Sequence, residues 1–337
     1  MTASRTVRIA EVARAAGVST TTVSRVLNNV PTVDEGSRRR VLAAITRLHY
    51  RPNTNAQRLA AGRNNTIALV IPRFADMFRS FHVMEMLKGV GTAAERLHLD
   101  LLLHVTDGRS LLNVGAAAGI LFADIDGNEE QLDWALQQGI PCVVMYQFLE
   151  ELPVSCVAVD NRGAVEDVVG YLAKLGHREI ATITGHLRTS IGIERLDGYV
   201  RAMQARQLEV KPHYVQHGDY TRASARPLAK ELLARDDRPT AVVAASDDMA
   251  VAVIEAASEL GLRVPEDLSV VGFDDSPIAS FSKVPLTTVW QPMSDVAGRS
   301  LEILHRLLSG AKRPVKQRLG TRLVERQSCR QTWLDPS

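Results

Sequence analysis

The chain has 337 residues, 45% of them apolar, and a net charge of +2, which is enough material for two or three compact domains. It contains no run of about 20 apolar residues, and no apolar stretch follows Met1–Arg8, so we expect neither a membrane span nor a signal peptide and predict a cytoplasmic protein. Cys142, Cys156 and Cys329 are few and widely spaced, which argues against a disulfide framework or a thiolate metal cluster.

The charge is distributed unevenly along the chain. The first 65 residues contain eleven arginines and no lysine against Glu11, Asp34 and Glu35, a net charge of +8, which leaves −6 for the remainder. A basic head on a mildly acidic body indicates a module that binds a polyanion such as DNA. The alternative is a solvated basic face that has no partner.

Two short helices are predicted at the start of the head. Apolar residues recur with helical spacing from Ile9 to Ala16, and Gly17 follows at the position of a helix C-cap. Ser19 is placed as the N-cap of a second helix, Thr20–Leu27, which packs on the first after a short turn. This arrangement is a helix-turn-helix.

A third helix is predicted from the cap residue Asp34 to the stop at Tyr50-Arg51-Pro52, with Arg38, Arg39 and Arg40 adding positive charge near its start. The next segment, residues 53–62, is helix-competent but too short and polar to be stable alone. Its Leu59 is placed either to wedge between base steps in the minor groove or to pack on the neighbouring domain.

Beyond Asn65, apolar strands alternate with amphipathic helices, which predicts a parallel α/β body. The predicted strands are Ile67–Ile71, Leu99–Val105, Gly119–Phe122, Cys142–Met145, Val157–Val159, Ile180–Thr184, Ala241–Ala244 and Ser269–Phe273. The predicted helices include Phe81–Leu97, Ala164–Leu175, Arg195–Ala205, Ala223–Ala234, Met249–Leu260 and Val296–Leu308. The crossover 106–118 leaves room for a short helix at most.

Several strings resemble the lactose-repressor/galactose-repressor family of bacterial regulators over nearly the whole chain. They are Ile9-Ala10-Glu11-Val12-Ala13, Ala16-Gly17-Val18-Ser19, Thr22-Val23-Ser24-Arg25-Val26-Leu27-Asn28, Tyr50-Arg51-Pro52-Asn53, Ala245-Ser246-Asp247-Asp248-Met249 and Gly272-Phe273-Asp274-Asp275. The resemblance implies an all-α helix-turn-helix domain with a hinge helix, followed by an α/β periplasmic-binding-protein-like core of two Rossmann-like subdomains. The implied domains are 1–52, the hinge 53–64 and the core 65–337, with subdomains of about 65–160 and 161–290 and the chain crossing back over 290–337.

The resemblance also implies a homodimer on a palindromic double-stranded DNA operator, with the second helix in the major groove and the hinge in the minor groove. The DNA-contacting residues would be Thr20, Thr21, Thr22, Ser24, Arg25, Asn28, Asn53, Ala56 and Leu59. Arg25 suits either a bidentate contact to guanine or a phosphate contact. The chain shows no heptad tail, so we expect dimers and not a coiled-coil tetramer.

Effector contacts carried over from the family are Arg73, Phe74, Tyr146, Arg195, Tyr220, Ser246, Asp247 and Asp274. Ligands of open α/β sheets lie beyond the carboxyl ends of the strands, where Ser246 and Asp274 fall. The expected effector is a sugar or sugar derivative. Tyr146 stands where many sugar-responsive relatives have aspartate, and Arg73 adds a charge, so an anionic ligand stays open. For Phe74 and Tyr220 the alternative is ordinary packing.

Catalytic and cofactor chemistry is not indicated. Gly89-Val90-Gly91 lies in a helical pattern and not after a strand, so we interpret it as packing and not as a dinucleotide site. His213 and His217 have metal-pair spacing but lie in strand and loop, so no metal or cofactor is expected. A solute receptor and a sugar-modifying enzyme are the rival hypotheses, and turnover of a candidate ligand would favour the enzyme.

Overall fold

The computed structural model describes residues 9–27, 30–48, 65–74, 77–108 and 117–332. The chain divides into two compact units, Met1–Asn64 and Asn65–Ser337. The predicted hinge 53–64, with Asn53, Ala56 and Leu59, and the predicted DNA contact Asn28 lie outside the described residues.

The first unit contains the three predicted helices, α1 (Ile9–Ala16), α2 (Thr20–Leu27) and α3 (Glu35–Arg47). Their boundaries follow from capping: Gly17 has φ +65°, Ser19 Oγ accepts from Thr22 N at 3.1 Å, and Asp34 Oδ1 accepts from Ser37 N at 2.8 Å. The helices share one small core, made of Val12, Ala13, Ala16, Val23, Val26, Val41 and Ala44.

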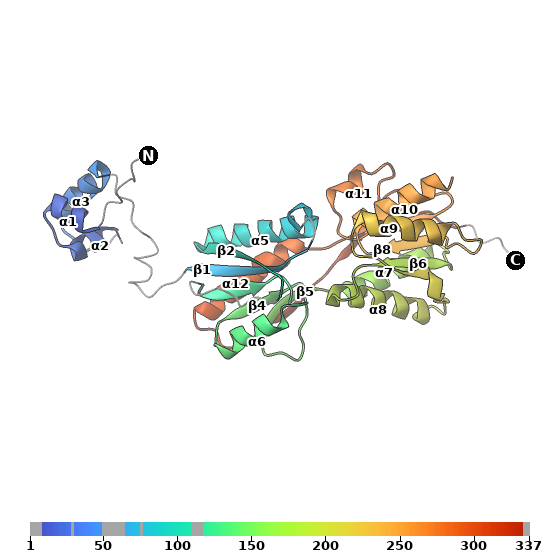
Figure 1. Ribbon diagram of the computed structural model, residues 1–337, viewed down its shortest axis with the longest axis horizontal. Helices are drawn as coiled ribbons and strands as arrows, with labels where there is room; N and C mark the ends of the chain where they lie inside the picture. The colour runs from blue at the N-terminus through green and yellow to red at the C-terminus, as the bar shows by residue number, and fades with distance from the viewer. Residues whose placement is uncertain (1–8, 28–29, 49–64, 75–76, 109–116, 333–337) are drawn as a thin grey trace. The chain divides into compact units, whose positions relative to one another are not determined.

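The second unit contains two parallel sheets with helices on both faces of each, as Figure 1 shows. The first sheet has the order β11-β5-β4-β3-β1-β2. Its strands are β1 (Thr66–Pro72), β2 (Asp100–Thr106), β3 (Gly119–Phe122), β4 (Cys142–Met145), β5 (Ser155–Val159) and β11 (Lys316–Leu319). Its helices are α5 (Phe81–Leu97), α6 (Glu129–Gln137) and α12 (Met293–Leu308), with a 3₁₀ turn at Met77–Arg79.

Strand alternation determines which helices cover each face of the first sheet. Ile67, Leu69 and Ile71 pack with residues of α5 and α12, whereas Ala68 and Val70 pack with residues of α6. Successive side chains of a strand point to opposite faces, so a strand buried on both sides consists almost entirely of apolar residues. This explains the uninterrupted apolar run of β1.

The second sheet has the order β7-β6-β8-β9. Its strands are β6 (Ile180–Thr184), β7 (Val215–His217), β8 (Ala241–Ala244) and β9 (Ser269–Val271). Helices α7 (Asn161–Lys174) and α8 (Ser190–Ala205) pack on one face, and α9 (Arg222–Leu233) and α10 (Asp247–Glu259) pack on the other. A short helix α11 (Pro277–Phe281) and a 3₁₀ turn (Pro212–Tyr214) complete this part.

The chain passes between the two sheets three times. It crosses from β5 to α7, returns from β10 (Thr288–Trp290) to α12, and crosses again from β11 to β12 (Arg322–Val324), which pairs with β10. We call the first sheet with its helices the first half of the second unit, and the second sheet with its helices the second half. Each half is therefore built from segments far apart in the sequence.

The predicted strands and helices of the second unit are present, within a few residues at their ends. Gly89 of α5 has the packing role that we predicted, since a Cβ there would lie 2.1 Å from Ser294 O of α12, whereas a Cβ on Gly91 would meet no atom within 4 Å. The sequence pattern did not predict strands β7, β10, β11 and β12 or helices α6 and α11. None of the described helices combines the length and the apolar character needed to cross a lipid bilayer.

Candidate functional site

The exposed face of α2 contains most of the described residues that we predicted to contact DNA. Val23 and Val26 are buried, whereas Thr20, Thr21 and Arg25 are exposed. Thr21 and Arg25 are four residues apart and therefore lie on one side of the helix. The helix thus presents two hydroxyls, a methyl-bearing surface and one guanidinium to solvent.

Thr22 and Ser24 are less open than these three residues. Both are half-buried, and Thr22 belongs to the cap of the helix, because its Oγ1 lies 3.0 Å from Ser19 Oγ. Thr22 therefore fixes the start of α2, which limits what its hydroxyl offers to another molecule.

The arginines at the start of α3 also stabilise the first unit. Arg38 Nη2 donates to Val30 O at 2.8 Å, and Arg40 Nε donates to Ala16 O at the end of α1 at 3.3 Å. Arg39 is exposed. The positive charge predicted here is present, and two of the three guanidinium groups also bond the backbone, one at the end of α1 and one in the loop before α3.

In the second half, polar side chains gather after the carboxyl ends of β8 and β9. We call Arg195, Tyr220, Ser246, Asp247 and Asp274 the strand-end cluster. Arg195 of α8 is 7% exposed, its Nη1 donates to Ala245 O at 2.5 Å, and its guanidinium lies 3.5 Å from the ring centre of Phe273. Its Nε donates to Asn161 Oδ1 at 3.0 Å. A buried cation is thus held in a fixed orientation.

Asp274 is the acidic counterpart of Arg195. Burial raises the pKa of its carboxyl to about 7, an effect that the charge of Arg195 opposes and the neighbouring Asp247 reinforces. Its Oδ1 accepts from Gln291 Nε2 at 2.6 Å. Near neutral pH this carboxyl therefore lies close to the midpoint of its titration and can accept or donate a hydrogen bond.

Ser246 and Asp247 already have partners within the protein. Ser246 Oγ accepts from Met249 N at 3.2 Å as the N-cap of α10 and donates to Tyr220 O at 3.1 Å. Asp247 Oδ2 accepts from both N and Oγ of Ser276, and its Oδ1 accepts from Thr288 Oγ1. Burial raises the pKa of Asp247 to about 6. These two side chains connect the loops that position Asp274.

The aromatic member, Tyr220, has φ +72° and packs tightly on Gly185, where a Cβ would lie 2.0 Å from the tyrosine Cζ. Its hydroxyl lies 3.3 Å from Thr189 Oγ1, and its ring centre is 6.0 Å from the Arg195 guanidinium. Glycine at 185 is therefore required for the ring to occupy this position.

Tyr146 and His82 of the first half form an aromatic pair. Tyr146 follows β4 with φ +64°, is 3% exposed, and its hydroxyl donates to Met293 O at 2.9 Å. The His82 ring meets it edge to face at 4.3 Å between ring centres. Burial, together with a smaller effect of the positive charge of Arg195, lowers the pKa of His82 to about 4. The imidazole is therefore neutral at physiological pH.

Arg73 and Phe74, the remaining predicted effector residues, are exposed, with 48% of Phe74 open to solvent. Within the described residues, no hydrogen bond, ion pair or ring contact joins either side chain to the strand-end cluster. The structure thus brings together five of the eight predicted residues, places Tyr146 with His82 in the first half, and leaves Arg73 and Phe74 exposed to solvent.

Sequence reasoning missed three side chains near these groups: His82, Asp126 and Gln291. Asp126 follows strand β3 by four residues, so the rule that ligands lie beyond the carboxyl ends of strands could have found it. His82 lies within a regular helical pattern, and Gln291 follows a strand of three residues, so neither had a clear signal. Asp126 accepts from Ser190 N of α8 at 2.9 Å.

Non-glycine residues with positive φ concentrate around the same groups. Among the described residues there are six, and four of them are Tyr146, Tyr220, Asp274 and Asp275. Such backbone costs of order 1–3 kcal/mol per residue and tends to be retained at functional sites. The backbone strain at these four residues therefore favours a functional role for this region over a purely structural one.

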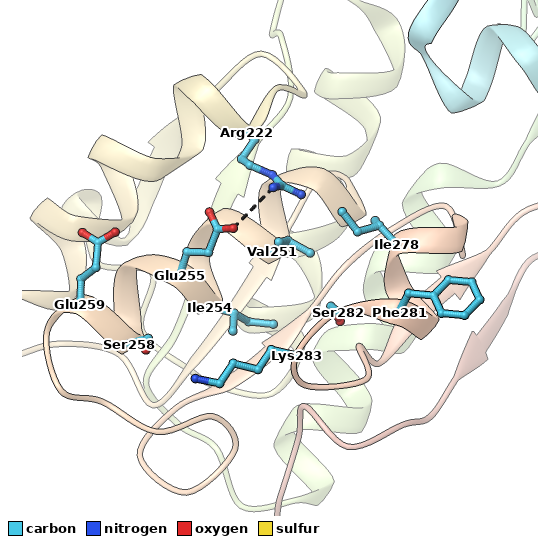
Figure 2. A pocket seen from close by; sticks show the side chains of 10 residues that line it. All are labelled: Arg222, Val251, Ile254, Glu255, Ser258, Glu259, Ile278, Phe281, Ser282 and Lys283. Carbon is cyan, nitrogen blue, oxygen red and sulfur yellow. Dashed lines mark hydrogen bonds and ion pairs between the residues drawn. The ribbon is translucent and has the colours of Figure 1, made fainter.

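A separate surface pocket lies on the outer side of α10 and α11. Figure 2 shows its lining, which includes Val251, Ile254 and Ile278 together with an Arg222–Glu255 ion pair of 3.4 Å. At its margin Phe281 is 88% exposed. None of the predicted effector residues lines it, and its mixture of exposed apolar and charged groups differs from the strand-end cluster, whose polar side chains are buried or half-buried.

A basic helix-turn-helix unit joined to a two-sheet α/β unit with polar groups at its strand ends is the architecture of a DNA-binding regulator. Residues 8–53 match the family described as bacterial regulatory proteins, lacI family, and residues 169–329 match the periplasmic binding protein-like domain. The chain belongs to the lacI family. It is a DNA-binding transcription regulator and not an enzyme.

Relatives match along most of the chain. Catabolite control protein A of Priestia megaterium is 33% identical over 312 residues, covering 90% of this chain and 93% of that protein. The HTH-type transcriptional regulator CelR of Thermobifida fusca is 35% identical over 335 residues, covering 94% and 96%. A lac repressor dimer bound to operator and the anti-inducer ONPF superimposes with TM-score 0.87 at 26% identity, covering 97% and 100%.

Proposed function

We propose that the protein is a homodimeric repressor that binds a palindromic operator and is controlled by a sugar or sugar derivative bound in a cleft at the strand-end cluster. The observation that supports the effector site best is that a buried, oriented Arg195 lies close enough to Asp274 for its charge to act on that carboxyl, at the carboxyl ends of the second sheet. Relatives solved with operator and with cellobiose support the two kinds of partner. A regulator of bacterial genes acts in the cytoplasm, where the DNA is.

The effector chemistry follows from the donors and acceptors of the cluster. Asp274 provides an acceptor for ligand hydroxyls. Arg195 uses Nε and Nη1 for its bonds to Asn161 and Ala245, so its Nη2 can donate to a ligand. The neutral His82, which is half-buried and packs on the buried Tyr146 ring, offers an aromatic surface for one face of a sugar ring. Because Arg73 is exposed and, among the described residues, makes no hydrogen bond or ion pair with the cluster, we propose a neutral polyhydroxyl ligand in preference to an anionic one.

On the DNA side, we propose that α2 lies in the major groove with Thr20, Thr21 and Arg25 toward the bases. Asn53, Ala56 and Leu59 of the hinge contact the minor groove, and Leu59 wedges between base steps at the centre of the operator. We propose residues 1–52 as the major-groove domain, 53–64 as the minor-groove hinge and 65–337 as the effector-binding core.

The first experiment is to incubate the purified protein with sheared genomic DNA of its source, with and without a metabolite extract, and to sequence the retained fragments at moderate salt. We expect enrichment of a palindromic site and a change in its yield when the extract is present. Fragments retained without any common site would show electrostatic affinity only and would favour the solute-receptor hypothesis.

Single substitutions then separate the two activities on the enriched site. Arg25→Ala should weaken operator binding by about 1–3 kcal/mol if Arg25 contacts a base. The control Arg14→Ala, on the exposed side of α1, should change affinity much less. Leu59→Ala should weaken specific binding, whereas Asp274→Ala should abolish the ligand response and leave operator binding intact. If neither Leu59→Ala nor Asp274→Ala has its effect, the proposal is wrong.

A further inference from the structure

The first turn of α8 belongs to the second half but contacts the first half through three successive features. Ser190 N donates to Asp126 Oδ2 at 2.9 Å, Ile191 packs against the core shared by α5, α12 and the first sheet, and Glu194 lies 3.7 Å from Arg318 Nη1 of β11. The two halves are thus joined at the start of this helix by side-chain and backbone contacts, in addition to the three chain crossings.

The chemistry of the Asp126 contact suits a helix start. The first amides of a helix have no acceptor within the helix, and its positive end favours a carboxylate. Thr189 Oγ1 accepts from Gly192 N at 3.1 Å as the N-cap, while Ser190 N takes its acceptor from the other half. An amide that the helix itself leaves unbonded is therefore satisfied only across the boundary between the halves.

Asp126 is held in place by its own half. Gln147 Nε2 donates to Asp126 Oδ1 at 3.3 Å, and Gln147 Oε1 accepts from Ile125 N at 3.1 Å, so the loops after β3 and β4 orient the carboxylate together. Burial raises the pKa of Asp126, and the hydrogen bond from Ser190 opposes that rise. The ionised carboxylate is thus stabilised by its contact with α8.

The same helix bears Arg195, one residue after Glu194. Contacts that hold the first turn of α8 against the first half also affect the distance between the Arg195 guanidinium and His82. The two side chains are close enough for the charge of Arg195 to lower the pKa of His82. The contact of Asp126 with Ser190, together with those of Ile191 and Glu194, therefore helps to set the position of Arg195 relative to the first half.

We propose that Asp126 is a positioning residue that fastens the first turn of α8 to the first half, so that the two halves close on each other without a bound ligand. Where the strand-end cluster is the effector site, which rests on the proposed function, an effector then finds Arg195 already positioned. The ligand has to supply only part of the free energy of closure.

The test measures amide hydrogen exchange at Ser190 in the full chain, free of DNA and ligand, resolved by NMR or by fragment mass spectrometry. In Asp126→Ala the Ser190 amide should exchange about tenfold faster or more, since a hydrogen bond to a charged acceptor is lost. Asp126→Asn keeps an acceptor oxygen and should restore part of the protection. Asp133→Ala, an exposed carboxylate on α6, is the matched control and should change nothing.

Faster exchange confined to the first turn of α8, with partial rescue by asparagine, supports the proposal. Unchanged protection of the Ser190 amide in Asp126→Ala overturns the proposal. The proposal is also overturned if Asp126→Ala and Asp126→Asn both accelerate exchange to the same extent along the whole of α8. Because the measurement uses neither operator nor effector, failure of the proposed function in the genomic DNA experiment leaves this test intact.

Discussion

Replacing Asp274 with asparagine should stabilise the second unit at neutral and alkaline pH. Burial raises the pKa of this carboxyl to about 7 from 3.8, so between these values the folded state binds more protons than the unfolded state. Its contribution to stability is therefore full below about pH 4 and is lost as the pH rises through about 7. Asparagine keeps an acceptor for Gln291 and carries no charge.

The size of the effect follows from the same pKa values. At about 1.36 kcal/mol per pKa unit, the ionised carboxylate costs up to about 4 kcal/mol above pH 7. Asp274 is partly exposed, so we expect about half of that, a gain of about 2 kcal/mol for Asp274→Asn at pH 8 and none at pH 4.

Urea denaturation followed by tryptophan fluorescence measures this difference directly. All three tryptophans lie in the second unit, at 134, 290 and 333, so the signal does not report on the first unit. Asp133→Asn, an exposed carboxylate on α6, is the control and should leave the free energy of unfolding unchanged at both pH values. If Asp274→Asn is no more stable than the wild type at pH 8, burial does not destabilise the ionised form of Asp274, and the reasoning is refuted.

Two further predictions concern packing and thiol chemistry. Gly89→Val should lower the free energy of unfolding by several kcal/mol, because its Cβ would meet Ser294 O of α12. Gly91→Ala has no atom near the new Cβ and should raise the free energy of unfolding by about 0.5–1 kcal/mol. Urea denaturation measures both changes. The native protein should react slowly with Ellman's reagent at pH 8, and all three thiols should react once it is unfolded, because burial raises the pKa of each. The three thiols are those of Cys142, Cys156 and Cys329. Rapid labelling of any of them in the native protein would contradict this reasoning.

Much of the fold could be predicted because its signals are local. The helices of the first unit follow from apolar spacing and from caps at Ser19 and Asp34, and the central strands follow from apolar runs such as β1. Strand β11 could not be found this way, because Lys316-Gln317-Arg318-Leu319 is a polar edge strand that acquires its register only by pairing with β5.

The candidate site was predictable only in part, for the same reason. Polar residues after strands, such as Ser246 and Asp274, follow from the rule for parallel sheets. The partners that those residues have within the protein depend on loops distant in sequence, as the engagement of Asp247 by Ser276 and Thr288 shows. The cross-boundary contact of Asp126 with α8 joins residues 64 positions apart, and no local pattern encodes it.

The threefold passage of the chain between the sheets has a consequence for biosynthesis. Helix α12 and edge strand β11 of the first sheet come from residues 293–319, so that sheet stays incomplete until nearly the whole chain has left the ribosome. Until then, β5 presents a bare strand edge and α5 an apolar face without its partner, and both favour aggregation of nascent chains. A prematurely terminated product that lacks α12 and β11 would therefore be a substrate for chaperones and proteases, and not a smaller version of the regulator.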